Sequence, residues 1–290
     1  IKLKNYFSQA IMNEIYQNLE HIIKNYSIGI DIDDNNIYLD TDGLIVSGTP
    51  YTQNTWMDVK YDGIPATPRN GKPVEINAMW YNALKVMVEL AEYQKDESKK
   101  EKYERMANKC KKSFREKFYN KSKKCLYDVL EDGKVRPNQL FALSLSYPVL
   151  DVNSKEAKEM FETVTKKLLN KYGLKTLAKG EENYIDIYEG NGFKRDFSYH
   201  QGITWTWLLG LYYNCLKRFA TESRTGKKKY NEQLEEFIQS VTETFSKEIN
   251  ERGCIGSIAE IYDSKRPYEP KGAIAQAWSV AEVFRIISEN

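Results

Sequence analysis

Hydrophobic residues recur at intervals of three or four positions along most of the chain, which is the period of an amphipathic α-helix. No block alternates apolar and polar residues over enough positions to indicate a strand-rich region. The pattern therefore predicts an all-α protein. Helices are expected near residues 3–26, 75–94, 98–119, 137–147, 155–170, 201–219, 228–249 and 272–288. The first of them carries an apolar stripe made of Phe7, Ile11, Ile15, Leu19, Ile22 and Ile23.

The expected helices alternate in character along the chain. One group has a charged face and is typical of outer helices that contact solvent: 98–119, 155–170 and 228–249. The other group is mostly apolar and is expected to form an inner ring: 75–94, 137–147, 201–219 and 272–288. Long connections inside a compact domain usually carry function. Here they are rich in Gly, Asp and Tyr and cover residues 27–74, 120–136, 171–200 and 250–271.

The length of 290 residues exceeds that of most single domains, but a helical ring of this length has one core. No linker or low-complexity segment divides the chain. The sequence therefore predicts a single domain over residues 1–290.

Charge and cysteine usage limit the partners and the compartment. The chain has 43 Lys and Arg residues against 41 Asp and Glu residues, and no basic stripe forms, so neither nucleic acid nor a membrane surface is an expected partner. No apolar run is long enough to span a membrane, and no signal peptide is recognisable. Four cysteines without paired spacing predict reduced thiols and a cytoplasmic location: Cys110, Cys125, Cys215 and Cys254.

Composition and motifs narrow the chemistry. The 5 Trp, 21 Tyr and 11 Phe residues suit sugar binding, although a tyrosine-rich core gives the same count. With only His21 and His200, and with no HExxH motif or phosphate-binding Gly-rich loop, no metal or cofactor is expected. No GxSxG motif supports a serine nucleophile. Paired carboxylates remain, and spacing does not choose among Asp58, Asp62, Glu75, Asp186, Glu189, Asp196, Glu260 and Asp263.

Several sequence blocks resemble the C-terminal amylo-α-1,6-glucosidase domain of glycogen debranching enzymes. The longest covers residues 54–84 and reads NTWMDVKYDGIPATPRNGKPVEINAMWYNAL. The others follow in the family's order: NQLFALSL (138–145), YHQGITWTWLLG (199–210), GSIAEIYD (256–263) and AQAWSVAEVFR (275–285). The resemblance extends over nearly all of residues 36–288, which makes it more specific than any single block.

The resemblance implies an α/α toroid of helical hairpins, of the six-hairpin glycosidase type. It also implies hydrolysis, with inversion, of α-1,6-linked glucose at the branch points of glycogen or limit dextrin. By position in the blocks, Asp58 matches the general acid and Glu260 the general base. The carboxyls of an inverting pair stand about 6.5–9.5 Å apart. Burial among Trp56 and Tyr262 is expected to keep the acid protonated, and nearby cations to keep the base ionised.

The same matching implies pocket-lining roles for Trp56, Arg69, Lys72, Glu75, Asn77, Trp80, Tyr81, Asn138, Gln139, Tyr199, His200, Gln201, Trp205 and Gln276. Trp80 and Trp205 also lie on apolar helical stripes, so core packing is an equal alternative to sugar stacking. Arg69 and Lys72 are expected to pair with carboxylates rather than to bind a neutral glucan. His200 is either a donor to a sugar hydroxyl or a buried structural residue.

The resemblance further indicates that the toroid is incomplete at its N-terminal side. Family members carry an Arg-Asp-Thr-containing helix and its neighbours before the segment that begins here at Ile1. A gap is therefore expected between the first and last helices, and the missing N-terminal segment of the parent protein is an expected partner. Two alternatives remain open: an inactive glucan-binding or structural fragment of such an enzyme, and a glucoamylase-like α-1,4-glucosidase.

Overall fold

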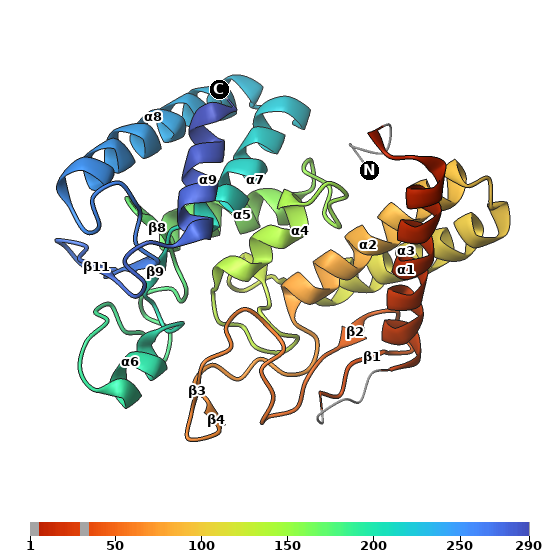
Figure 1. Ribbon diagram of the computed structural model, residues 1–290, viewed down its shortest axis with the longest axis horizontal. Coiled ribbons are helices and arrows are strands. Elements are labelled where there is room, and N and C mark those ends of the chain that lie inside the picture. The colour runs from red at the N-terminus through yellow and green to blue at the C-terminus, as the bar shows by residue number, and fades with distance from the viewer. Residues whose placement is uncertain (1–5, 30–34, 290) are drawn as a thin grey trace.

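The structure is rich in helices, which follow one another in an open arc (Figure 1). The computed structural model describes residues 6–29 and 35–289, so residues 3–5 of the first expected helix lie outside it. The long helices are α1 (Gln9–Ile28), α2 (Val74–Tyr93), α3 (Glu97–Lys117), α5 (Lys155–Lys167), α7 (Leu208–Glu222), α8 (Lys227–Glu251) and α9 (Ala277–Ser288).

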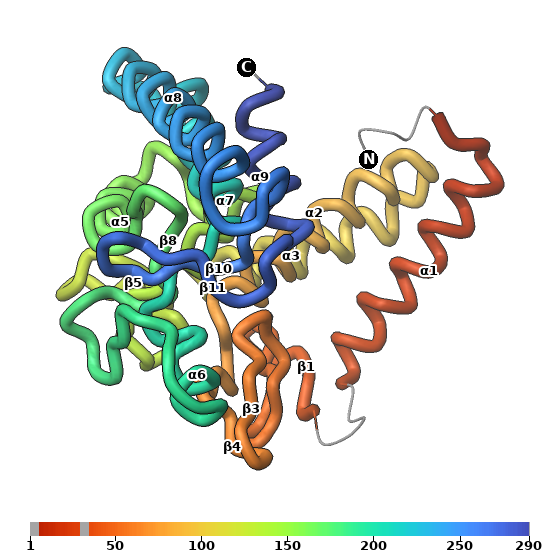
Figure 2. Tube along the Cα trace, turned by 60° about the vertical axis from the view of Figure 1, so that its left-hand side comes forward, coloured from red at the N-terminus to blue at the C-terminus, as the bar shows by residue number. Residues whose placement is uncertain are grey.

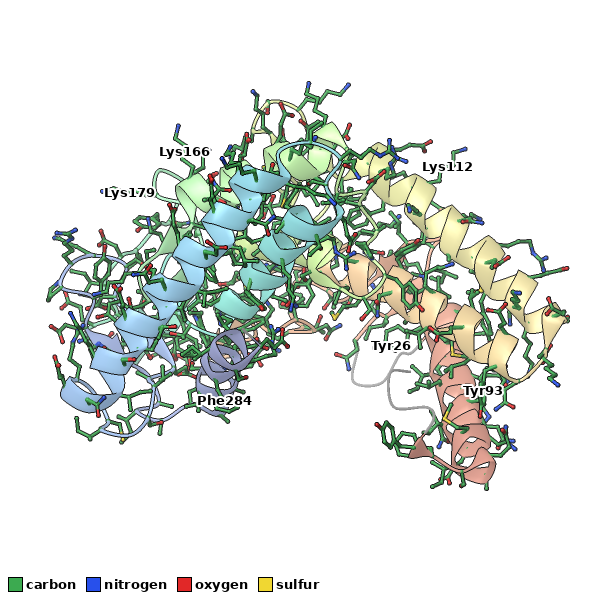
Figure 3. All side chains as sticks on the ribbon, turned by 90° about the horizontal axis from the view of Figure 1, so that it is seen from above. Tyr26, Tyr93, Lys112, Lys166, Lys179 and Phe284 are labelled. Atoms are coloured by element: carbon green, nitrogen blue, oxygen red, sulfur yellow. The ribbon has the colours of Figure 1, made fainter. Side chains whose placement is uncertain are left out.

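Inner and outer helices alternate as the sequence predicts. The apolar α2 packs against α3 on its outer side, and α7 likewise packs against the outer helix α8. The inner helix α9 packs against both α7 and α8. Phe161 of α5 stacks on Tyr212 of α7 with 4.9 Å between the ring centroids, so α5 also covers α7 from outside. Viewed from above, the arc runs from α1, which carries Tyr26, to α9, which carries Phe284, and it does not close between them (Figure 3).

Three inner helices are shorter than expected. Residues 137–147 form a 3-10 turn, η2 (Pro137–Leu140), and a single helical turn, α4 (Phe141–Ser144), because the chain is already extended at Leu145. The helix expected at 201–219 begins only at Leu208, since the residues before it turn and form a strand. The last helix begins at Ala277, whose amide is capped by the side chain of Gln276.

Short antiparallel strands, which the hydrophobic pattern does not predict, occupy the connecting segments. Five of them form one sheet in the order β11–β10–β9–β8–β7: β7 (Leu169–Asn170), β8 (Gly173–Lys175), β9 (Thr204–Trp205), β10 (Ile261–Tyr262) and β11 (Pro270–Lys271). The others form the hairpins β1 (Tyr38–Leu39) with β2 (Ile45–Val46), β3 (Lys60–Tyr61) with β4 (Ile64–Pro65), and β5 (Tyr119–Asn120) with β6 (Cys125–Leu126). The sheet register pairs Trp205 with Ile261, which joins two of the motif segments.

Both ends of the arc leave apolar side chains exposed. On α1, Met12 and Ile23 are buried, whereas Ile11 and Ile22 of the predicted stripe are 45% and 50% exposed. The contacts of α1 are with α2 and β1, and with α3 through Glu20, which accepts from Lys99 and Tyr103. On α9, Phe284 is 69% exposed. Within residues 6–29 and 35–289, no helix combines the length and the hydropathy that crossing a membrane requires.

The connection before β9 depends on a glycine. Gly202 has φ +131°, and a Cβ atom there would overlap the carbonyl oxygen of Ile185 and approach the Tyr184 ring at 2.7 Å. Gly180 also has a positive φ, +96°, but a Cβ atom there would meet nothing within 4 Å. A substitution at Gly180 therefore tests backbone strain alone, whereas one at Gly202 tests strain together with steric overlap.

We predict that Gly180→Ala lowers the free energy of unfolding by about 1–2 kcal/mol, the cost of a side chain at positive φ. Gly202→Ala is expected to cost about 1–3 kcal/mol more, because the Ile185 backbone must also move. Urea denaturation of the two variants measures the difference. Equal losses would show that the close approach at Gly202 is unimportant.

Candidate active site

Aromatic rings from segments far apart in the sequence form one cluster. Trp56 meets three other rings edge-on: His200 at 5.1 Å, Trp205 at 5.3 Å and Trp207 at 5.0 Å. Trp207 in turn stacks on Trp278 of α9 at 5.0 Å. The segment before β3, the segment around β9 and the last helix therefore meet at a single place.

Asp58 lies at the edge of this cluster. Met57 is fully buried and anchors the backbone of this segment in the core, whereas the next residue, Asp58, is exposed. The expectation that Trp56 and Tyr262 bury Asp58 is therefore wrong. Tyr262 is itself buried, and its hydroxyl donates to Glu248 at 3.0 Å.

Glu260 is half-buried and held by two donors. Its carboxylate accepts hydrogen bonds from the side-chain amide of Gln276 at 2.9 Å and from the backbone N–H of Ala273 at 3.2 Å. Its own backbone N–H donates to the Ala273 carbonyl at 2.9 Å. Both carboxylate donors are neutral, so the cations expected beside this residue are not its partners among the described residues.

Tyr199 belongs to the aromatic cluster, because its ring contacts His200 at 4.9 Å and Trp205 at 4.8 Å. Burial, a hydrogen bond with Glu260 and the negative charge of Glu260 raise the pKa of the Tyr199 phenol far above its usual range, and the charge of Asp58 adds to the shift. Trp205, which the Tyr199 ring contacts, pairs in the sheet with Ile261, the residue after Glu260. The raised pKa keeps the hydroxyl of Tyr199 protonated.

A network of buried, oppositely charged side chains is joined to the cluster through Asn138. The Arg69 guanidinium forms two hydrogen bonds with Glu75, and it donates to Asp128 through Nε at 2.6 Å and Nη2 at 3.1 Å. Asn138 donates to Asp128 at 2.8 Å and accepts from the indole N–H of Trp56 at 2.7 Å. The network thus fixes the orientation of Trp56, two residues before Asp58.

Arg136 holds the other side of the cluster. It donates to the carbonyl oxygen of His200 at 2.6 Å and to the side chain of Gln201 at 2.8 Å. Gln201 in turn donates to the Ala66 carbonyl at 3.1 Å. The sequence blocks did not single out Arg136, Asp128, Trp207 or Trp278. Trp207 and Trp278 lie within recognised blocks, whereas no sequence signal marks Asp128.

His200 is buried in a neutral state. Burial, and then the positive charges of Arg136 and Arg69, lower its pKa well below its usual value. Neither ring nitrogen has a hydrogen-bond partner among the described residues. The ring stacks on Trp205, with 5.3 Å between centroids and 19° between planes. It therefore behaves as another flat, uncharged ring of the cluster.

Several residues of the predicted pocket lie in other contacts. Trp80 stacks on Tyr26 of α1 at 6.2 Å, away from the cluster that contains Trp56. Tyr81 lies beneath the ammonium group of Lys111 on α3, at 5.5 Å from its ring centre. The structure therefore separates both rings from the aromatic cluster.

The remaining polar positions serve the scaffold. Lys72 pairs with Asp40 at 2.6 Å and Asp42 at 2.7 Å, so it contacts carboxylates as expected, but not those of the candidate site. The Asn77 side chain bonds to both the N–H and the carbonyl of Ile45. Gln139 accepts from the backbone N–H of Leu126 and donates to the Arg136 carbonyl.

The four cysteines are free, and three of them are buried. In residues 6–29 and 35–289, no group of three or more His, Cys, Asp and Glu side chains is placed to hold a metal ion.

Comparison with known proteins gives a family match over almost the whole chain. The family model described as amylo-alpha-1,6-glucosidase matches residues 3–285. A glycogen debranching enzyme of Saccharomyces cerevisiae is 26% identical over 223 residues, which are 61% of this chain and 14% of that protein. The matched segment thus spans about a seventh of the yeast protein's length.

Two solved structures show a similar fold. A sialidase structure superposes with a TM-score of 0.63 at 14% identity, covering 94% of this chain and 23% of that one. A GH63 mannosylglycerate hydrolase from Thermus thermophilus, in complex with glucose, superposes with a TM-score of 0.51 at 10% identity, covering 77% of this chain and 46% of that one. Helical glycosidase folds are therefore the architecture to which this arc is similar.

We predict that Asp128→Asn lowers the free energy of unfolding by about 3–5 kcal/mol, because Arg69 and Arg136 lose a buried counter-charge. Asp132→Asn is the control, since Asp132 lies in the same loop and its side chain is 30% exposed. Guanidinium denaturation measures the loss, and tryptophan fluorescence reports the release of Trp56. A loss of less than about 1 kcal/mol for Asp128→Asn would contradict the role of the network.

Proposed function

The chain belongs to the amylo-alpha-1,6-glucosidase family, and we propose on that premise that Asp58 and Glu260 hydrolyse α-1,6-linked glucose at the branch points of a glycogen-like glucan. Family membership makes the chain a glycoside hydrolase. The observation that carries the proposal is that the two carboxylate segments meet: Trp56, two residues before Asp58, lies edge-on to Trp205 at 5.3 Å, and Trp205 pairs in the sheet with Ile261, the residue after Glu260.

The proposed reaction inverts the configuration at the anomeric carbon. Asp58 donates a proton to the leaving oxygen while Glu260 takes a proton from a water that attacks the opposite face of the glucose ring. Space for this water requires the carboxyl groups to stand about 6.5–9.5 Å apart. The hydrogen bonds from Gln276 and Ala273 support the role of Glu260 as the base, because they fix its carboxylate without neutralising it.

The aromatic cluster supplies the binding surface for the cleaved glucose. The C–H face of a sugar ring packs well against an indole. Trp56 lies two residues before Asp58, and Trp205 pairs in the sheet with Ile261, the residue after Glu260. The indole N–H of Trp56 is occupied by Asn138, so this ring contributes its face rather than a hydrogen bond.

Residues 1–290 are proposed to form one domain, since buried residues from Met12 to Ile286 belong to one hydrophobic core.

A second function has an observation in its favour. Asp58 is exposed and the arc is open, so a chain that binds glucan without cleaving it fits the same geometry. Release of glucose from limit dextrin distinguishes the hydrolase from a binding fragment. A glucoamylase-like enzyme would instead release glucose faster from linear α-1,4 chains than from α-1,6 stubs.

Removal of either carboxyl is expected to abolish most of the turnover. Asp58→Asn and Glu260→Gln should each lower kcat on limit dextrin by at least about 10²–10⁴-fold, because each removes a proton-transfer group. Asp62→Asn and Glu251→Gln are controls at exposed positions. In the unmodified chain, NMR should detect β-glucose as the first product. Detection of α-glucose, or full activity of either variant, would require another pair of residues.

Gly272 offers a test that leaves both carboxyls in place. It has φ +69°, and a Cβ atom there would overlap the carboxylate of Glu260. Gly272→Ala is therefore expected to lower kcat by about 10²-fold with little change in KM, because a displaced base no longer orients the water. The matched control is Gly256→Ala, at φ +83° with no atom within 4 Å of its Cβ. Equal kcat values for the two variants would contradict the placement of Glu260.

A further inference from the structure

A patch of partly and fully exposed apolar side chains lies where hairpin β3–β4 packs against helix α6 (Gly192–Ser198). We call it the rim patch and define it by Tyr61, Ile64, Phe193 and Phe197. The Tyr61 ring meets Phe193 edge-on at 5.1 Å, and Phe193 contacts Phe197 at 4.5 Å. The hairpin and α6 lie side by side, at the opposite end of the molecule from the C-terminus (Figure 1, Figure 2).

Local sequence determines the geometry of the patch. Asp62 and Gly63 both have positive φ, +49° and +77°, the combination that a two-residue hairpin turn requires. The turn places Tyr61 directly opposite Ile64 in the register of the two strands. On the other side, Phe193 and Phe197 are four residues apart and share one face of α6.

The patch stays open to solvent on a segment with little other packing. Phe193 is 46% exposed and Ile64 is 62% exposed. Of the seven residues of α6, only Ser198 is buried. A contiguous apolar surface of this kind beside a binding site typically marks contact with a ligand.

The charges around the patch do not favour a charged ligand. Lys60, Lys194 and Arg195 are accompanied by Asp62 and Asp196, so both signs are present and the basic excess is one charge. A polyanion or an anionic membrane would require an excess of basic residues. The surface instead suits a neutral ligand with apolar faces and hydroxyl groups.

Both halves of the patch adjoin the candidate active site. Tyr61 follows Asp58 by three residues, which corresponds to at most about 10 Å of extended chain. Phe197 precedes Tyr199, whose ring contacts Trp205 of the aromatic cluster at 4.8 Å, by two residues. A polymer whose end lies between the two carboxylates therefore reaches the patch with its next units.

We propose that the rim patch binds the α-glucan chain that carries the branch, by stacking Tyr61 and Phe193 against the C–H faces of its glucose rings. The inference rests on the proposed function. It adds that the protein recognises the polymer chain at this patch, separately from the single glucose that is cleaved.

Binding is tested first, without reliance on catalysis, by native electrophoresis in gels that contain glycogen. The unmodified chain should be retarded, and the double variant Tyr61→Ala/Phe193→Ala should bind about tenfold more weakly, since two stacked rings are lost. Phe193→Tyr, which keeps a ring, and Tyr6→Ala, at a tyrosine that is 82% exposed elsewhere, should both be retarded normally. No retardation of the unmodified chain, or normal retardation of the double variant, would overturn the proposal.

Kinetics with two substrates then separates the patch from the catalytic pair. The double variant should raise KM for limit dextrin about tenfold and leave kcat/KM for α-glucosyl fluoride, which has a single glucose ring, unchanged. An equal loss of kcat/KM on both substrates, or an unchanged KM for limit dextrin, would overturn the proposal that the rim patch binds the glucan chain. If neither substrate is hydrolysed by the unmodified chain, the proposed function fails, whereas the gel result still decides the binding of the chain. Circular dichroism of each variant confirms that it is folded.

Discussion

The candidate site depends on one buried guanidinium, that of Arg69. It lies between the carboxylates of Glu75 and Asp128, and all three side chains are only 1% exposed. Buried charges are tolerated only when they are paired and hydrogen bonded, so the three side chains fix one another. Glu75 belongs to the first turn of α2, where a negative charge is also favoured by the helix dipole. The network thereby ties the start of an inner helix to the loop that contains Asp128, and through Asn138 to Trp56.

The two carboxylates are held by different parts of the arc. Asp58 follows the anchored residues Trp56 and Met57, near the beginning of α2, whereas Glu260 is tied to Gln276 at the beginning of α9. The position of α9 is set by its contact with α7, where Arg285 donates to the Gly210 carbonyl at 3.2 Å. Glu260 is also held by the sheet, because the next residue, Ile261, pairs with Trp205 of β9 and Lys271 of β11. The placement of Glu260 therefore depends on both α9 and the sheet.

The sequence predicted the long helices well because their apolar stripes repeat over many turns. It did not predict the strands, since a strand of two residues, such as Thr204–Trp205, is too short for alternation to appear. The motif blocks located both carboxylates, but block membership alone did not separate Trp205, in the cluster, from Trp80, which stacks on Tyr26. Asp128 could not have been found from the sequence, because its importance comes from Arg69, which is distant in the chain.

The distribution of charge around the aromatic cluster follows from the same buried network. Arg69 and Arg136 donate their N–H groups to Glu75, Asp128 and backbone carbonyls, so their positive charge is paired with buried acceptors of the scaffold. His200 is neutral because burial, and then those cations, disfavour its protonation. Among the described residues, no Lys or Arg forms an ion pair with Asp58 or Glu260. A neutral sugar at this cluster would therefore meet flat uncharged rings and two carboxyl groups, and a cation bound to either carboxyl would oppose its exchange of protons with the substrate.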